Sequence, residues 1–136
     1  VLTRLVEVLL IEALRATPGD DAPAGLLRGL ADARLAPALR QMHAQHKRAW
    51  TVTQLAKTAS LSRSAFFERF TRTVGRPPME YLLAWRMALA RDLLRRENLG
   101  IAEVAERIGY GSASTFSTAF SRYVGQPPSQ YAREAQ

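Results

Sequence analysis

The chain repeats part of its own sequence after about fifty residues. With an offset of 50, ten of the twenty positions from 62 to 81 are identical. The identical pairs are Ser62 and Ser112, Ser64 and Ser114, Phe66 and Phe116, Phe70 and Phe120, Arg72 and Arg122, Val74 and Val124, Gly75 and Gly125, Pro77 and Pro127, Pro78 and Pro128, and Tyr81 and Tyr131. Upstream the offset becomes 49, pairing Ala56 with Ala105, so the second copy has gained one residue in its turn. Two copies of one structural unit are therefore expected.

Each copy has the pattern of a short helix, a tight turn and a longer helix. The first copy is expected to form helices over 52–59 and 62–74, and the second over 101–108 and 112–124. A serine opens each longer helix, where its hydroxyl can accept a hydrogen bond from a free backbone N–H, and a glycine follows each helix end. This pattern predicts helix-turn-helix motifs over 52–75 and 101–125.

The longer helix of each motif is expected to bury one face and present the other. Apolar side chains recur at helical spacing on the face predicted to point inward: Phe66, Phe70 and Val74 in the first copy, and Phe116, Phe120 and Val124 in the second. In a helix-turn-helix the second helix enters the major groove of DNA, so its outer face should be polar.

A long helix is predicted to link the two motifs over residues 78–96, with Pro77 and Pro78 at its start and Arg95 and Arg96 in its last turn. The eighteen residues from Met79 to Arg96 give roughly 27 Å at 1.5 Å per residue. Successive major grooves on one face of DNA lie about 34 to 36 Å apart, so one chain is expected to place a recognition helix in each of two adjacent grooves.

Upstream of the motifs, the sequence favours further helices. Apolar residues at helical spacing in 1–16 predict an amphipathic helix, and the Pro, Gly and Asp residues of 17–23 predict a loop or linker. Asp32 is expected to cap a helix whose buried stripe is Leu35, Leu39 and Met42. Thr51 and Gln54 have the spacing of a capping box. No strand alternation is evident, so the fold class is all-α.

Charge and composition narrow the class of protein. Residues 1–46 hold five basic and five acidic side chains, whereas 47–136 hold fourteen basic and seven acidic, so the net charge of +7 belongs to the second part. A basic module of this kind suits a nucleic-acid partner, and equally an anionic membrane surface or plain solubility. The absence of cysteine excludes disulfides, thiolate metal sites and a cysteine nucleophile. The apolar stretch from Val1 to Leu14 is broken by charges and too short to span a membrane.

Enzymatic chemistry has little support in the sequence. His43 and His46 are three residues apart, a spacing that some metal sites use, but no third ligand is evident, so no metal or other cofactor is expected. No phosphate-binding glycine loop or nucleophile elbow is present. Trp50, Trp85 and Tyr81 are most simply core or interface aromatics. The chain is not expected to be an enzyme.

From residue 32 to 136 the sequence resembles the AraC/XylS family of bacterial transcription regulators. The resemblance rests on spaced matches in both copies and in the linker helix. These are Trp50-Thr51-Val52, Leu55-Ala56, Ser62-Arg63-Ser64-Ala65-Phe66, Val74-Gly75-Arg76-Pro77-Pro78, Tyr81-Leu82, Trp85-Arg86-Met87, Ile101-Ala102-Glu103-Val104-Ala105, Ile108-Gly109-Tyr110, Phe116, Phe120, Gly125-Gln126-Pro127-Pro128 and Tyr131.

The resemblance implies a DNA-binding domain over 32–136, preceded over 1–31 by the terminal helix and linker of an effector or dimerisation domain. It implies sequence-specific binding of double-stranded promoter DNA in transcription regulation, as in the activators of this family. RNA polymerase is the further partner implied, and the location is the bacterial cytoplasm, at the nucleoid. No membrane partner is expected. A homodimer through residues 1–16 is a further prediction, because that helix has a wide apolar face.

The family reads bases from the outer face of each second helix, and position by position the resemblance implies the following DNA-binding residues: Ser62, Arg63, Ser64, Phe67, Glu68, Arg72, Arg86, Ala113, Ser114, Ser117, Thr118 and Arg122. Glu68 suits a cytosine amino group and Phe67 a thymine methyl. The alternatives are that Phe67 belongs to the core, that Glu68 pairs with Arg72 or Arg63, and that each arginine is solvated. The second helix of the second motif lacks long polar side chains at its tip, so hydroxyl contacts to phosphate and shape readout are expected there.

A second class of function is also compatible with the sequence. In this alternative the chain is a protein-interaction or dimerisation module, in which the helix over 1–16 pairs with another chain and DNA binding is only non-specific. Salt dependence and sequence preference separate the two hypotheses, because non-specific binding is almost wholly electrostatic.

Overall fold

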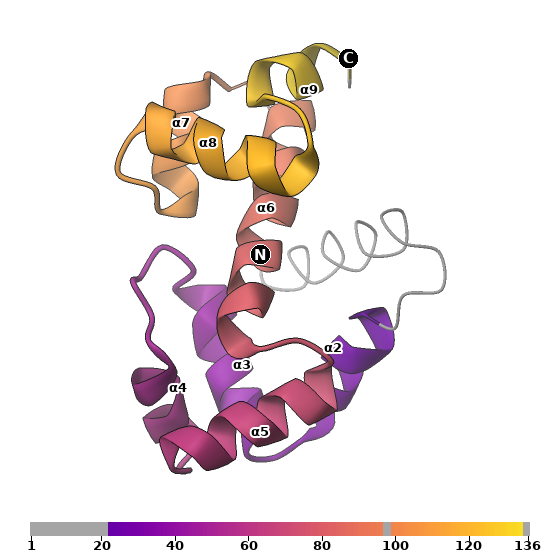
Figure 1. The fold of residues 1–136 in the computed structure, drawn as a ribbon, viewed down its shortest axis with the longest axis vertical. Coiled ribbons are helices and arrows are strands. Elements are labelled where there is room, and N and C mark those ends of the chain that lie inside the picture. Colours follow the sequence, from indigo (N-terminus) through magenta and orange to yellow (C-terminus); the bar gives the residue numbers. More distant parts are fainter. Residues whose placement is uncertain (1–21, 97–98, 135–136) are drawn as a thin grey trace. The chain divides into compact units, whose positions relative to one another are not determined.

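The computed structural model describes residues 22–96 and 99–134, and every regular element in these ranges is a helix (Figure 1). The helices are α2 Ala22–Ala31, α3 Leu35–Ala44, α4 Val52–Thr58, α5 Arg63–Val74, α6 Pro78–Arg96, α7 Ile101–Ile108, α8 Ala113–Val124 and α9 Pro128–Glu134. The predicted all-α class is confirmed, and α6 has the bounds predicted for the linker helix. The amphipathic helix predicted over 1–16 lies outside the described residues.

The chain divides into two compact units, one ending at Trp85 and the other beginning at Arg86, so the division falls within α6. The first unit contains α2 to α5 and the start of α6, and the second contains the rest of α6 with α7 to α9. Each unit includes one complete helix-turn-helix: α4 and α5 in the first, α7 and α8 in the second. No described helix is both long and apolar enough to cross a membrane.

The turns of the two motifs confirm the repeat and locate its extra residue. Leu61 N–H donates to Ala56 O in the first motif, and Tyr110 N–H donates to Ala105 O in the second, which is the predicted offset of 49. The N-cap serines that follow are 50 residues apart. The inserted residue is therefore Gly111, between Tyr110 and Ser112.

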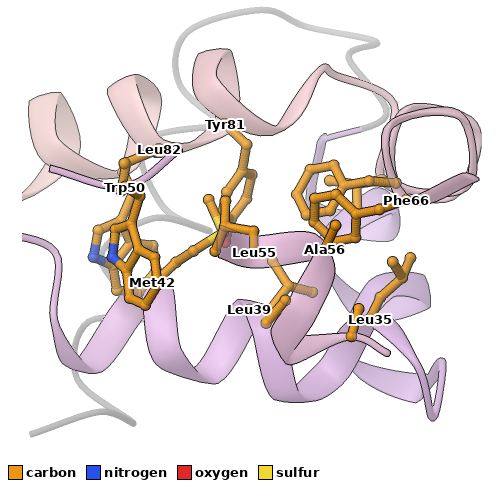
Figure 2. Close-up of a cluster of buried hydrophobic side chains, with 14 of the residues drawn as sticks. Leu35, Leu39, Met42, Trp50, Leu55, Ala56, Phe66, Tyr81 and Leu82 are labelled. Carbon is orange, nitrogen blue, oxygen red and sulfur yellow. The ribbon is translucent and has the colours of Figure 1, made fainter. Parts of the chain in front are cut away.

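The core of the first unit lies among α3, α4, α5 and the start of α6. Leu35, Leu39 and Met42 of α3 are fully buried, as predicted, and Figure 2 shows Leu35 on the side of Phe66 and Met42 on the side of Trp50. The remaining buried residues of this cluster are Leu26, Ala38, Trp50, Leu55, Ala56, Ala59, Phe66, Phe70, Val74 and Trp85. The three aromatics Trp50, Tyr81 and Trp85 are core residues, in agreement with the sequence prediction.

His43 is part of the same core and has the environment of a neutral core histidine. Its Nε2 lies 2.6 Å from the Tyr81 hydroxyl, and its ring stacks on that of Trp85 with centroids 3.7 Å apart. Burial, with a smaller contribution from the neighbouring His46, lowers the pKa of His43 to about 4. His43 is therefore neutral at pH 7 and packs as an aromatic ring.

Helix α2 was not foreseen from the sequence, which assigns residues 1–31 to the end of a preceding domain. The structure forms a helix from Ala22 to Ala31 and packs it against α3 and α5 (Figure 1). Leu26 is buried in the core of the first unit, and Leu30 packs against that core. Residues 22–31 thus fold together with the first motif.

The core of the second unit is smaller and aromatic. Phe116 and Phe120 of α8 are fully buried, as predicted; the Phe116 ring is tilted against that of Tyr110 and the Phe120 ring meets that of Tyr131 edge to face, at centroid distances of 5.7 and 5.6 Å. Val124, also predicted to point inward, is only half-buried. Its counterpart Val74 is buried beneath α2, and the second unit contains no corresponding helix among its described residues.

Candidate nucleic-acid interface

Both predicted recognition helices begin and end in the same way. Ser62 Oγ accepts from Ala65 N–H at 3.2 Å, and Ser112 Oγ accepts from Thr115 N–H at 3.1 Å. Gly75 and Gly125 terminate the helices with φ of 97° and 96°, in the left-handed region that favours glycine. The predicted serine caps and glycine ends are confirmed, and each helix is about three turns long.

The shorter helix of the first motif is fixed by the predicted capping box. Thr51 Oγ1 accepts from Gln54 N–H, and Gln54 Oε1 accepts from Thr51 N–H, each at 3.1 Å. This pair satisfies two backbone donors that a helix start would otherwise leave free. The start of α4, and with it the turn before α5, is thereby set locally by the sequence.

The outer face of α5 is open to solvent along two stripes. One stripe contains Arg63 and Phe67, and the other contains Ser64, Glu68 and Arg72; all five residues are exposed. The Phe67 ring is 44% exposed, so the alternative that Phe67 belongs to the core is wrong. An exposed aromatic ring between charged residues is a plausible contact for an apolar group such as a thymine methyl.

The predicted pairing of Glu68 with Arg72 is present. Arg72 Nη1 lies 3.6 Å from Glu68 Oε1, with the two side chains 70% and 78% exposed. A pair so exposed contributes little to stability, because water screens both charges. Both groups are therefore available to exchange this contact for one with a ligand.

The outer face of α8 is narrower and carries short side chains. Ser114, Thr118 and Arg122 form an exposed stripe, whereas Ala113 and Ser117 are half-buried. Thr118 Oγ1 donates to Ser114 O at 3.1 Å, so this hydroxyl is already engaged with its own helix. The structure thus gives α8 fewer free polar groups than α5.

Arg86 lies in α6 rather than on a recognition helix. It is half-buried beside Tyr110, and burial lowers its pKa, with the Tyr110 hydroxyl acting in the opposite direction. Burial likewise raises the pKa of Tyr110, an effect that Arg86 reduces. Arg86 thus belongs to neither of the exposed stripes described above.

Two polar residues on the recognition helices were missed by the sequence analysis. Arg69 of α5 is half-buried and pairs with Asp32, 37 residues earlier in the chain. Thr115 is exposed in the first turn of α8, where its Oγ1 accepts from Ser112 Oγ at 2.9 Å. Helical spacing predicts that Thr115 is accessible, but no local signal pairs Arg69 with a residue so distant in sequence.

Comparisons with known proteins agree with this geometry. A family described as helix-turn-helix domains matches residues 55–134, which covers both recognition helices. The chain is 46% identical over 115 residues to a protein described as an AraC-like transcription regulator from Streptomyces lividans, covering 85% of this chain and 37% of that protein. It is 36% identical over 116 residues to the transcriptional regulator AlkR of Acinetobacter baylyi, covering 85% and 38%. The chain thus spans well under half the length of these relatives.

Solved structures give the same result. The DNA-binding domain of AdpA, crystallised with a target DNA, aligns with a TM-score of 0.68 at 28% identity, covering 76% of this chain and 92% of that one. The C-terminal domain of AraT, a response regulator from Geobacillus stearothermophilus, aligns with a TM-score of 0.70 at 28% identity, covering 76% and 86%.

Fold, repeat and relatives together define a double helix-turn-helix protein. The chain belongs to the AraC/XylS family, as its sequence motifs predict.

Proposed function

We propose that this chain binds double-stranded promoter DNA in a sequence-specific way, with α5 and α8 in adjacent major grooves. The observation that carries the proposal is the exposed double stripe of α5, held by caps that the second motif repeats on α8. The AdpA domain, which shares this fold, is known in complex with a target DNA.

The first motif supplies most of the base discrimination in this proposal. Glu68 accepts a hydrogen bond from a cytosine amino group, and Phe67 packs on a thymine methyl. Ser62, Arg63, Ser64 and Arg72 surround these two side chains and contact phosphates, which fixes the helix in the groove without reading sequence. The Glu68 to Arg72 ion pair opens as each partner takes up its own DNA contact.

The second motif contributes chiefly affinity. Ser114 offers a hydroxyl and Arg122 a charge to phosphates along the groove, and Thr118 does so by exchanging its hydrogen bond to the Ser114 carbonyl for one to phosphate. Ala113 and Ser117 are half-buried and provide small apolar or shape contacts. Arg86 adds positive charge from α6. Because α5 and α8 differ in this way, the half of the DNA site read by α5 should be more strongly defined in sequence than the half contacted by α8.

Selection of bound duplexes from a random pool at near-physiological salt tests the proposal. The expected result is a site with two elements whose centres are about 10 base pairs apart, the spacing of successive major grooves. The element read by α5 should be the more strongly defined. Failure to enrich any sequence, together with weak binding abolished by salt, would instead favour the protein-interaction module.

Two substitutions on α5 separate base reading from phosphate contact. Arg63→Ala should lower the slope of log affinity against log salt by about one, because one phosphate contact is lost. Phe67→Ser, which copies the residue of the second motif at this position, should change base preference and leave the slope unchanged. Leu27→Ala is the control, because Leu27 is 58% exposed on α2 and belongs to neither outer stripe, and it should alter neither quantity. An unchanged base preference in Phe67→Ser would contradict the role given to that ring.

A regulatory role at promoters further implies contact with RNA polymerase and a place at the bacterial nucleoid in the cytoplasm. The homodimer predicted through residues 1–16 concerns a segment outside the described residues and stays a prediction. Sedimentation of the whole chain tests it, since a monomer at micromolar concentration would contradict it.

A further inference from the structure

The segment from Gly25 to Arg34, here called the clamp segment, contacts the first helix-turn-helix at three separate places. It includes most of α2 and the turn that leads into α3. Its contacts fall on the C-terminal end of α5, on the middle of α5, and on the turn between α4 and α5. None of these contacts involves the outer stripes of α5.

The C-terminal end of α5 is the first contact. A Cβ atom at Gly25 would overlap the backbone carbonyl oxygen of Val74, and one at Gly29 would lie 2.9 Å from Val74 Cγ2 and 2.7 Å from Leu39 Cδ1. The two glycines, one helical turn apart, therefore let the α2 backbone rest directly on the end of α5. Arg28 Nε donates to Thr73 O at 3.0 Å, which satisfies a free carbonyl and places positive charge at the helix C-terminus.

The middle of α5 is held by an ion pair. Arg69 Nε and Nη2 donate to the two carboxylate oxygens of Asp32 at 2.9 and 3.2 Å. The same carboxylate accepts from Arg34 N–H and Leu35 N–H at the start of α3. Burial raises the pKa of Asp32, but the hydrogen bonds from Arg69 and from these two amides outweigh it, so the pKa lies below its ordinary value. One carboxylate thus ties the start of α3 to the middle of the recognition helix.

The turn of the motif is the third contact. Arg34 Nη1 donates to Ser60 O at 2.9 Å. Ser60 is the one described residue other than glycine with a positive φ, 58°, so its carbonyl lies at the most constrained point of the turn. The clamp segment thereby reaches α5 at its far end, at its middle, and through the turn that precedes it.

The second motif differs at the positions that meet the clamp segment. Ala119 occupies the position of Arg69, so the ion pair has no counterpart there, and Gly109 and the half-buried Val124 stand in place of Ser60 and Val74. Near the end of α8, the guanidinium of Arg91 from α6 lies 6.0 Å from the centre of the Tyr123 ring. The second unit has no described helix in the place of α2, so its recognition helix is supported by other elements.

We propose that the clamp segment positions α5 for base reading, so that the sequence discrimination of the first motif depends on residues outside the helix-turn-helix. The inference rests on the proposed DNA-binding function. Its physical basis is that α5, whose inner face packs in the core, is further held by the clamp segment at its C-terminal end, at its centre and at the turn that precedes it. Residues 25–34 are positioning residues and touch no base.

Three variants of the whole chain test the clamp. Gly25→Ala drives a methyl group into the Val74 carbonyl, although alanine is the better helix former. Asp32→Asn keeps an oxygen to cap α3 but removes the charge that holds Arg69. Leu27→Ala is the control, because Leu27 is on the same helix and 58% exposed.

The first measurement is amide hydrogen exchange, which needs no DNA. In Gly25→Ala the protection of residues 71–75 should fall by roughly tenfold or more, while that of the equivalent residues 121–125 is unchanged. Leu27→Ala should leave both unchanged. Unchanged exchange at 71–75 in both clamp variants would overturn the proposal whatever the DNA result.

The second measurement is the loss of affinity caused by single base changes in each half of the selected DNA site. A mismatched pair commonly costs roughly fivefold to a hundredfold. In Gly25→Ala and Asp32→Asn the penalty should shrink to under about threefold in the half read by α5 and stay at its wild-type value in the other half. Equal shrinkage in both halves would indicate general unfolding and overturn a positioning role, as would unchanged penalties in both halves.

Arg69→Ala, which copies the residue of the second motif, separates positioning from direct DNA contact. If Arg69 serves the clamp, Asp32→Asn and Arg69→Ala weaken discrimination equally, and the double variant is no worse than either. If Arg69 instead binds phosphate and Asp32 restrains it, Asp32→Asn raises DNA affinity, which overturns the proposal. A wild-type chain that selects no sequence refutes the proposed function and the positioning role together, while exchange at 71–75 still reports whether the clamp contact exists.

Discussion

The two helix-turn-helix motifs share a backbone and differ in what surrounds it. The residues identical between them are those that build the motif: the capping serine, the buried phenylalanine pair and the terminal glycine. The outward face is shared only in part, because Ser64 and Arg72 recur as Ser114 and Arg122, whereas Phe67 and Glu68 correspond to Ser117 and Thr118. The scaffold has thus been kept in both copies, while the side chains proposed to read bases have diverged.

The surroundings have diverged as well. Helix α5 is held by α2 and by the Asp32 ion pair, whereas the corresponding positions around α8 are small residues or half-exposed ones. The motif with the richer reading surface is also the one with the more extensive support. This correlation is physically sensible, because base discrimination by long side chains requires a helix of fixed orientation.

Truncation of one buried phenylalanine in each motif gives the largest expected effect. Phe66→Ala and Phe116→Ala each remove a fully buried ring, which should lower the free energy of unfolding of its own unit by about 3 to 5 kcal/mol. Hydrogen exchange of α5 and α8 distinguishes the two units within one sample. If either substitution lowered protection equally in both motifs, the description of two separate compact units would be wrong.

The second largest effect is expected from acid, which should destabilise the first unit more than the second. His43 is buried in the first unit with its pKa lowered to about 4, and no histidine occurs in residues 86–136. The unfolded chain binds a proton at His43 below about pH 6.5 and the folded unit does not, so stability falls as the pH drops from 6.5 to 4. The full loss is roughly 3 kcal/mol.

The measurement is unit-resolved exchange or melting between pH 7 and 4. The first unit should lose protection within this window, and His43→Gln should remove most of that dependence. An equal loss in the second unit would show that carboxylates rather than His43 dominate the acid response.

A smaller effect is expected from the ion pair that only the first motif has. Asp32→Asn should lower the free energy of unfolding by about 1 kcal/mol at pH 7, because Arg69 is 40% exposed and solvent screens the pair. The folded-state pKa of Asp32 is lowered, so this contribution is present above the ordinary aspartate pKa and disappears as the pH falls through the lowered value. Urea titrations of both proteins at pH 7 and pH 3 check it. A difference that persisted unchanged at acid pH would mean that the amide disturbs the cap of α3.

The sequence predicts those features that are set by neighbours along the chain. The capping box at Thr51, the serine caps and the inward phenylalanines all follow from spacing of three or four residues, and all are confirmed. The exposure of Phe67 follows from the same helical period. The internal repeat also predicts the two motifs and the linker helix between them, because the same order of helices and turn is expected in both copies.

Features that depend on distant residues were not predictable in this way. The need for glycine at positions 25 and 29 of α2 arises from the close approach of Val74, which is 49 residues from Gly25. The ion pair of Arg69 with Asp32 spans 37 residues, and the half-burial of Ser117 depends on packing in the second unit. The bases that Glu68 and Phe67 contact are not encoded in either the sequence or the fold, since they belong to the DNA.

The smallest effect is expected at the turn position where the first motif has Ser60 and the second has Gly109. Ser60 has φ of 58°, and its counterpart Gly109 has φ of 97°. A residue with a Cβ atom is strained in this region, but glycine has more freedom to lose on folding. Ser60→Gly should therefore stabilise the first unit by only about 0.5 kcal/mol, and Gly109→Ser should destabilise the second by about 1 kcal/mol. Thermal melts of the two variants check the signs. Destabilisation by Ser60→Gly would mean that the Ser60 side chain itself supports the turn, and the two motifs would then differ in how they turn as well as in what they read.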